Sequence, residues 1–81
     1  MTATILLVED DPEQSALYAQ VLEASGYSVV TTASAEAAQE GLNTTPVVLL
    51  LSDWDLGRDV MQGDALIAWA KARDPHLKTI L

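Results

Sequence analysis

The fold of this chain is decided by residues 5–11, which have the sequence ILLVEDD. Four consecutive apolar residues are typical of a strand buried on both faces of a parallel sheet, and three acids follow them. A second stretch, residues 47–55 with the sequence VVLLLSDWD, repeats this arrangement. Open parallel sheets bind ligands just beyond the carboxyl ends of their strands. If the two strands are neighbours, up to five carboxylates converge at one edge of the sheet.

Such a group of carboxylates is strongly repulsive. Two like charges about 4 Å apart repel by roughly 4 kcal/mol at an effective dielectric near 20. A proton, wide spacing or a bound cation relieves this repulsion. A hard divalent ion with oxygen ligands, such as Mg²⁺, is the simplest of these solutions, so the acidic edge is predicted to hold one.

Composition limits the class of protein. The 81 residues allow one small domain, and an apolar content of 49% indicates a packed core rather than disorder. Twelve acids against four bases give a net charge of −8, so this segment offers no basic patch for nucleic acid. The absence of cysteine excludes disulfides and thiolate metal sites. The sequence shows neither a signal peptide nor an apolar run of membrane-spanning length, so a cytoplasmic location without membrane contact is expected.

Helix signals follow the first acidic stretch. Asp11 is a suitable N-cap, Pro12 suits the first helical position, and Gln14 has the spacing of a capping box. Gly26 is a suitable residue just beyond the end of the helix. Apolar residues at helical spacing place three side chains on one face of this helix: Leu17, Val21 and Ala24.

The rest of the chain alternates strand and helix. Residues 27–32 are β-branched and aromatic, as in a strand, whereas residues 53–63 form a polar connection that is long for a strand-to-helix loop. This alternation predicts a parallel sheet covered by helices through right-handed crossovers. The expected strands are residues 4–8, 27–32, 47–52 and 78–81. A second helix, capped by Ser34, is expected to turn Ala35, Ala38 and Leu42 inward. A third helix, ending at Asp74-Pro75, is expected to turn Leu66, Trp69 and Ala70 inward.

The fourth strand ends with the sequence, and an unpaired parallel edge invites aggregation. Residues 1–81 are therefore expected to be the N-terminal part of a single larger domain. Exposed surface on the fourth strand and the first helix is expected to favour a homodimer or a strand-swapped dimer.

The two acidic stretches resemble the receiver domain of two-component response regulators. Residues 5–12 are similar to that family's opening strand, and residues 50–56 are similar to its phosphoacceptor strand. The resemblance covers essentially all 81 residues. It implies a flavodoxin-like α/β fold with helices on both faces of the sheet and strand order 2-1-3-4, the fifth strand and last helices being absent from this chain.

The resemblance also implies a role for each acid. Asp53 would be the phosphoacceptor and a Mg²⁺ ligand, Asp10 a direct ligand, Glu9 a ligand through water, and Asp55 a ligand through its backbone carbonyl. The phosphoryl group would come from a sensor histidine kinase or a histidine phosphotransfer protein. The domain would not be an enzyme beyond phosphotransfer at its own site and slow autodephosphorylation.

The sequence departs from the family in three ways. The family's phosphoryl-contacting Ser or Thr and Lys, at the ends of the fourth and fifth strands, would lie beyond Leu81. Gly57 stands where the family usually has Pro, and the loop before Gly63 is about two residues longer. The segment alone is therefore expected to accept phosphate poorly.

Other chemically notable residues have simpler explanations. Asp11 is expected to be a helix cap rather than a ligand. The remaining expectations are a rim position for Trp54, a core position for Trp69, a surface loop position for His76, and solvated loop charges for Arg58 and Asp59. The resemblance to receiver domains also implies that the first helix, which carries Tyr18 and Gln14, helps to dock the histidine-bearing partner.

Two alternatives stay open at this point. The motif Asp53-Trp54-Asp55 also resembles that of haloacid dehalogenase-type phosphatases, with Asp53 as nucleophile and Asp55 as acid/base, although there the motif usually follows the first strand. The other alternative is a degenerate receiver that acts only as an interaction module, and it predicts no dependence on Mg²⁺.

Overall fold

A computed structural model describes residues 3–53, 55–57 and 60–81. The predicted alternation of strands and helices is confirmed. The second and third strands start later than predicted, at Ser28 and Leu49, and the fourth ends one residue earlier, at Ile80. The elements in chain order are β1 (Thr4–Val8), α1 (Pro12–Ala24), β2 (Ser28–Thr32), α2 (Ala35–Thr44), β3 (Leu49–Ser52), α3 (Gly63–Arg73) and β4 (Lys78–Ile80).

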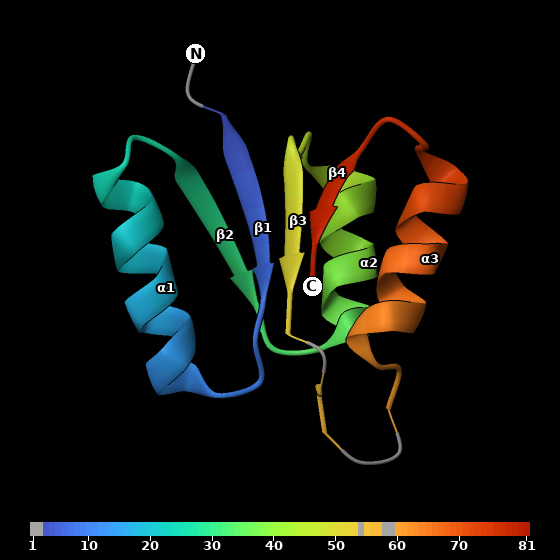
Figure 1. Ribbon diagram of the computed structural model, residues 1–81, viewed down its shortest axis with the longest axis horizontal. Coiled ribbons are helices and arrows are strands. Elements are labelled where there is room, and N and C mark those ends of the chain that lie inside the picture. The colour runs from blue at the N-terminus through green and yellow to red at the C-terminus, as the bar shows by residue number, and fades with distance from the viewer. Residues whose placement is uncertain (1–2, 54, 58–59) are drawn as a thin grey trace.

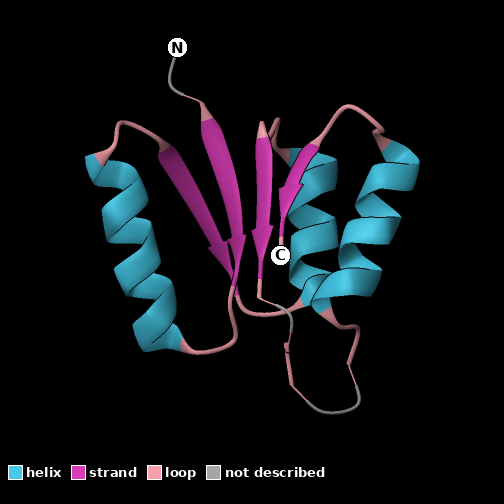
Figure 2. Cartoon of the chain, in the orientation of Figure 1, coloured by secondary structure: helices cyan, strands magenta, loops and turns pink. Residues whose placement is uncertain are grey.

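The four strands form one parallel sheet in the order β2-β1-β3-β4, as predicted (Figure 1). All arrowheads point the same way in Figure 2, so the carboxyl ends of the strands share one edge. Val8, the last residue of β1, pairs with Thr32 of β2 and with Ser52 of β3. This register places the two acidic stretches side by side.

Helices cover both faces of the sheet, which is also as predicted. Successive strand residues point to opposite faces. Leu6, Val8 and Leu50 belong to the main core, which α2 and α3 complete. Ile5 and Leu7 point to the other face, where α1 packs beside β2 and β1 (Figure 1).

The inner faces of α2 and α3 match the sequence prediction. Ala35 and Ala38 of α2 and Leu66 and Ala70 of α3 are fully or almost fully buried. Leu42 and Trp69, the other two residues predicted to face inward, are partly buried against the same core. Both helices therefore have a fixed orientation against the sheet, which positions the loop between β3 and α3.

The predicted apolar face of α1 is wrong. Leu17 and Val21 are 57% and 58% exposed, and none of the 13 residues of this fully described helix is buried. The half-buried positions are instead Ser15, Ala19 and Leu22, which follow the same helical spacing. Two small side chains in that row let the helix approach the sheet closely, so the bulkier row is turned outward.

The N-terminus of α1 matches the prediction in its cap residue and in Pro12, but not in the capping box. Asp11 is the N-cap, and its Oδ1 accepts from the Glu13 N–H at 2.9 Å. The predicted capping box does not form, because the Asp11 N–H donates to Glu9 Oε1 at 3.1 Å. Gln14 instead accepts from the Tyr18 hydroxyl at 3.3 Å. Glu9 is thereby tied to the first turn of α1.

The C-terminus of α1 is stopped by Gly26, as predicted. Gly26 has φ +97°, a left-handed conformation that favours glycine. Its N–H donates to the Glu23 carbonyl, and the Tyr27 N–H donates to the Leu22 carbonyl. These two bonds form a Schellman motif.

Apolar side chains remain exposed on α1 and β4. Leu17, Val21, Ile80 and Leu81 are each at least 50% exposed. The predicted dimer through this surface stays a prediction. Within the described part of the chain, no helix has the length and hydrophobicity needed to cross a bilayer.

Candidate metal centre at the carboxyl ends of β1 and β3

Three carboxylates converge where β1 and β3 end. Backbone pairing continues one residue past the strands, since the Glu9 N–H donates to the Thr32 carbonyl and the Asp53 N–H donates to the Val8 carbonyl, both at 3.0 Å. The two segments that follow β1 and β3 therefore leave the sheet side by side in the same direction. Glu9, Asp10 and Asp53 each contribute one carboxylate oxygen to a group whose members all lie within 4.8 Å of one another.

Burial differs sharply within this group. Glu9 is only 6% exposed, whereas Asp53 is half-buried and Asp10 is exposed. Burial raises the pKa of Glu9 above its ordinary value, and the negative charges of Asp53 and Asp10 raise it further. The Asp11 N–H, which donates to Glu9, partly offsets this rise. An ionised Glu9 is therefore a destabilising group that a cation would stabilise.

The geometry fits a small divalent ion. In octahedral coordination at 2.0–2.1 Å, opposite ligand oxygens lie about 4.2 Å apart. The observed spacing of up to 4.8 Å reaches this value after small side-chain movements, or is spanned when one ligand binds through water. All three donors are carboxylate oxygens, the type that hard cations prefer. The acidic cluster is thus suited to bind a metal.

The loop after β3 folds back over these acids. Gly57 has φ +113°, and an ideal Cβ built on it would lie 4.0 Å from Asp10 Oδ2. Proline, which the family usually has at this position, fixes φ near −65° and could not adopt this conformation. The Asp55 side chain accepts from the Gly57 N–H at 3.0 Å, so its carboxylate is engaged in a local turn. The metal group found among the described residues does not include it.

Two residues at this edge were not identified from the sequence. Ser52 is 3% exposed, and its hydroxyl donates to the Asp53 carbonyl at 2.9 Å. An ideal Cβ on Gly63 would collide with that same carbonyl oxygen and would lie 3.0 Å from Ser52 Oγ. The start of α3 therefore packs directly against the backbone of Asp53. The sequence signal that could have identified Gly63 was a glycine at the first position of a helix that follows a long loop.

Three further expectations for single residues are confirmed, whereas the partner-docking role of the helix that carries Tyr18 and Gln14 stays a prediction. Asp11 is a cap and lies outside the metal group found among the described residues. His76 is exposed, and its backbone N–H donates to Asp74 Oδ1. Trp69 packs against the core and carries the Arg73 guanidinium 4.6 Å from its ring centroid. The expectations for three residues lie outside the described part of the chain: Trp54, Arg58 and Asp59.

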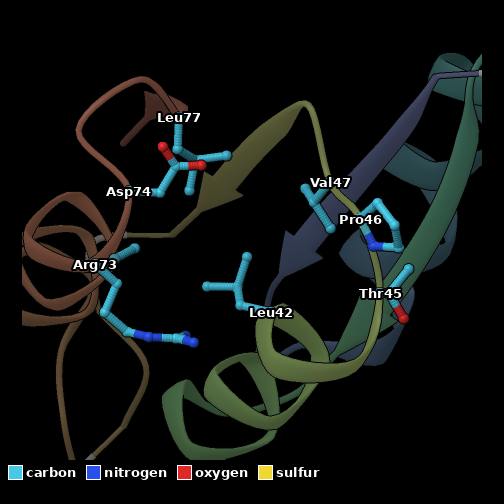
Figure 3. A pocket seen from close by; sticks show the side chains of 8 residues that line it. Leu42, Thr45, Pro46, Val47, Arg73, Asp74 and Leu77 are labelled. Atoms are coloured by element: carbon cyan, nitrogen blue, oxygen red, sulfur yellow. The ribbon is translucent and has the colours of Figure 1, made fainter.

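The hollows of the surface are distributed over both ends of the sheet. One of about 210 Å³ lies beside Glu9 and Asp53, with Tyr18 in its wall. Another of about 390 Å³ lies at the opposite end, between the last turns of α2 and α3, where Leu42 and Arg73 line it (Figure 3). Figure 3 shows both apolar and polar side chains around that second hollow, with Leu42 and Val47 on one side and Arg73 on the other. The carboxylate cluster is confined to the first end.

Comparison with known families identifies the class of protein that this fold and site define. The sequence model described as "Response regulator receiver domain" matches residues 5–81. The chain belongs to this family of two-component receiver domains.

Individual relatives agree with this assignment. The chain is 38% identical over 79 residues to the transcriptional regulatory proteins GlrR of Escherichia coli K12 and QseF of Escherichia coli O157:H7. Each match covers 98% of this chain but only 17% of the length of the relative. NtrX from Brucella abortus matches 98% of this chain at 29% identity and TM-score 0.90, over 18% of its own length. The signal receiver domain of an HD domain-containing protein from Pseudomonas fluorescens matches all of this chain at 26% identity and TM-score 0.91, over 63% of its own length.

Membership of this family resolves part of the functional question. The chain is a receiver domain of two-component signalling, a signalling domain rather than a classical enzyme. The phosphatase alternative built on Asp53 and Asp55 has no support from these comparisons. Receiver domains of response regulators have histidine kinases or phosphotransfer proteins as partners.

In the metal-free protein at neutral pH, Glu9→Gln is expected to increase the free energy of unfolding. Two like charges 4.8 Å apart repel by roughly 1 kcal/mol in water and 3 kcal/mol at an effective dielectric near 20, and the substitution removes this repulsion. Because folding raises the pKa of Glu9, the wild type loses stability as pH rises through the folded-state pKa. The advantage of the variant should therefore grow from about pH 4 to neutrality.

Urea denaturation in the presence of EDTA, repeated across this pH range, measures the difference. Glu40→Gln, which neutralises an exposed acid in α2, is the control and should show no such trend. An advantage of Glu9→Gln that shrinks as pH rises would contradict the prediction.

Proposed function

We propose that this receiver domain accepts a phosphoryl group on Asp53 with Mg²⁺ bound at the acidic edge of the sheet. Asp10 and Asp53 would be direct ligands, Glu9 a ligand through water, and Asp55 a ligand through its backbone carbonyl. The observation that carries the proposal is the convergence of three carboxylates from β1 and β3 within 4.8 Å. Membership of the receiver family adds independent support.

Each acid has a distinct task in this proposal. An oxygen of the Asp53 carboxylate attacks phosphorus in line, the bond from phosphorus to the imidazole nitrogen of phosphohistidine breaks, and the leaving imidazole keeps the electron pair. The product is an acyl phosphate on Asp53. Glu9 and Asp10 hold the cation, which when bound offsets the charge of the phosphoryl oxygens. Attack of water on this acyl phosphate would return Asp53 slowly to its free form.

The partners follow from this chemistry. The donor would be a sensor histidine kinase or a histidine phosphotransfer protein. We further propose that residues 1–81 form the N-terminal part of a single receiver domain. In support, the chain spans 63% of a solved signal receiver domain. Two relatives are transcriptional regulatory proteins, which favours a cytoplasmic response regulator whose output lies outside these residues.

Phosphorylation of the full-length protein by phosphoramidate in the presence of Mg²⁺ tests the proposal. The wild type is expected to gain the mass of one phosphoryl group, which hydroxylamine removes as expected for an acyl phosphate. Asp53→Asn should show complete loss of the adduct, since an amide is not a nucleophile for this reaction. Asp64→Asn, an exposed acid in the first turn of α3, is the matched control and should be phosphorylated normally.

Two outcomes would contradict the proposal. An adduct that persists in Asp53→Asn would place the acceptor elsewhere. A wild type that gains no adduct and whose intrinsic fluorescence does not change with Mg²⁺ would favour the degenerate receiver, an interaction module only.

A further inference from the structure

The side chain of Gln62 ties the loop after β3 to the start of α3. Gln62 occupies the N-cap position of α3, yet among the described residues its side chain makes no capping bond to that helix. It turns back to the loop instead. Its Oε1 accepts from the Leu56 N–H at 2.8 Å, and its Nε2 donates to the Gly57 carbonyl at 2.6 Å and to the Val60 carbonyl at 3.3 Å.

This set of bonds requires a carboxamide. The Leu56 N–H can only donate and the Gly57 carbonyl can only accept, so the orientation of the Gln62 amide is fixed by its partners. A hydrocarbon side chain of similar length would satisfy neither partner. Leu56 is 4% exposed and packs in the main core, so its N–H would be left without an acceptor in a partly buried position.

The bond to Leu56 also sets the direction of the Asp55 carbonyl. The Leu56 N–H and the Asp55 C=O belong to the same peptide group, which is planar. None of the peptide bonds of the described residues is cis, so this C=O points away from the N–H, and therefore away from Gln62. Fixing the N–H on Gln62 therefore fixes the direction in which the Asp55 carbonyl points.

The far end of this connection is itself fixed. Gly63, the residue after Gln62, packs against the Asp53 carbonyl and Ser52 Oγ. The backbone of Gln62 is therefore held against the end of β3, and its side chain transmits that position to the loop. On the other side of the loop, Gly57 approaches Asp10 Oδ2, so the segment held by Gln62 lies against the acidic cluster.

We propose that Gln62 is a positioning residue that orients the backbone carbonyl of Asp55 for the cation. The inference rests on the proposed function, because it assumes that this carbonyl is a metal ligand. Gln62 itself does not touch the ion. Its role is to hold the loop in the metal-bound arrangement before the ion arrives, which removes an ordering cost from binding.

Mg²⁺ titration of the full-length protein, followed by intrinsic fluorescence, tests the inference in the wild type and in Gln62→Leu. The expected result is a Kd at least about 10-fold higher in Gln62→Leu, the range found for residues that orient metal ligands. The control is Gln39→Leu, which removes another half-buried amide. Gln39 lies in α2, and its Nε2 donates to Sδ of Met61 in the loop. This variant should leave the Kd unchanged.

A second measurement separates positioning from simple loss of folding. Hydrogen exchange of the Leu56 amide in the metal-free protein should accelerate in Gln62→Leu, while the exchange of the β1 and β3 amides stays protected. Faster exchange at Leu56 with an unchanged Kd would overturn the inference and leave the proposed metal site intact. A wild type that does not bind Mg²⁺ would overturn the proposed site and this inference with it.

Discussion

Gly63→Ala is expected to lower the free energy of unfolding by about 3 kcal/mol or more, the upper end of the cost of overpacking. The new methyl group would collide with the Asp53 carbonyl oxygen and would lie 2.9 Å from Leu81 Cδ1. A backbone carbonyl at the end of a paired strand cannot move aside as a flexible side chain can. Relief therefore requires α3 to shift away from the sheet, which also opens the core around Leu66.

Gly41→Ala is a matched control for this substitution. Gly41 also lies within a helix, and an ideal Cβ there would meet Leu6 Cδ1 at 3.4 Å, an ordinary contact. Alanine is favoured over glycine in a helix interior by about 1 kcal/mol, so this variant should be as stable as the wild type or more stable. Thermal or urea denaturation of both variants measures the contrast. Equal effects at the two positions would show that helix propensity, not the contact with Asp53, decides the result.

Asp10→Asn is expected to weaken Mg²⁺ binding by roughly 100-fold. Loss of a residue that merely orients a ligand costs 10–100-fold in metal affinity, so loss of a charged direct ligand should reach at least the upper end of that range. Asp10 is exposed, and the substitution keeps the shape of the side chain, so the fold should be preserved. Mg²⁺ titration followed by intrinsic fluorescence gives the two dissociation constants.

The neighbouring acid provides the control for charge. Asp11→Asn removes the same unit of charge one residue away, and asparagine caps a helix about as well as aspartate, so α1 should keep its N-cap. Its Kd for Mg²⁺ should rise only modestly, because the substitution keeps the backbone N–H that donates to Glu9 and changes only a side-chain charge outside the metal group. If Asp10→Asn and Asp11→Asn weaken binding equally, the cluster attracts cations by its overall charge and holds no specific site.

The sequence was sufficient to predict the sheet and the cluster of acids. Two apolar stretches that each end in acids predict two strands with an acidic edge, and the resemblance to receiver domains implies that these strands are neighbours. Once β1 and β3 pair in register, the convergence of Glu9, Asp10 and Asp53 follows from geometry. Ser34 and Gly26 mark helix ends through local hydrogen bonding, which sequence signals capture well.

The parts that were not predicted depend on competition between nearly equal choices. α1 offers one row with Leu17 and Val21 and another with Ala19 and Leu22, and spacing alone cannot decide which row meets the sheet. The choice depends on how closely the helix can approach β1 and β2. Likewise, the Asp11 N–H had two possible acceptors; the sequence spacing indicated Gln14, whereas in the structure the N–H donates to Glu9 Oε1 and Gln14 accepts from the Tyr18 hydroxyl.

The path of the long loop between β3 and α3 was even harder to predict from the sequence. Its length was evident from the sequence, but the path between Asp53 and Gly63 depends on a positive φ at Gly57 and on the three bonds made by the Gln62 side chain. Side-chain bonds to the backbone of a loop leave no periodic pattern. They become visible only when the positions of all the partners are known.

The hydrogen bond from the Asp11 N–H to Glu9 Oε1 links the acidic centre to the positive end of a helix dipole. The same carboxylate interacts with the charges of Asp53 and Asp10, so any proton or cation that neutralises Glu9 weakens its bond to the first turn of α1. The first turn of α1 is therefore electrostatically coupled to the acidic cluster through this bond. It registers the electrical state of a site that it does not enter.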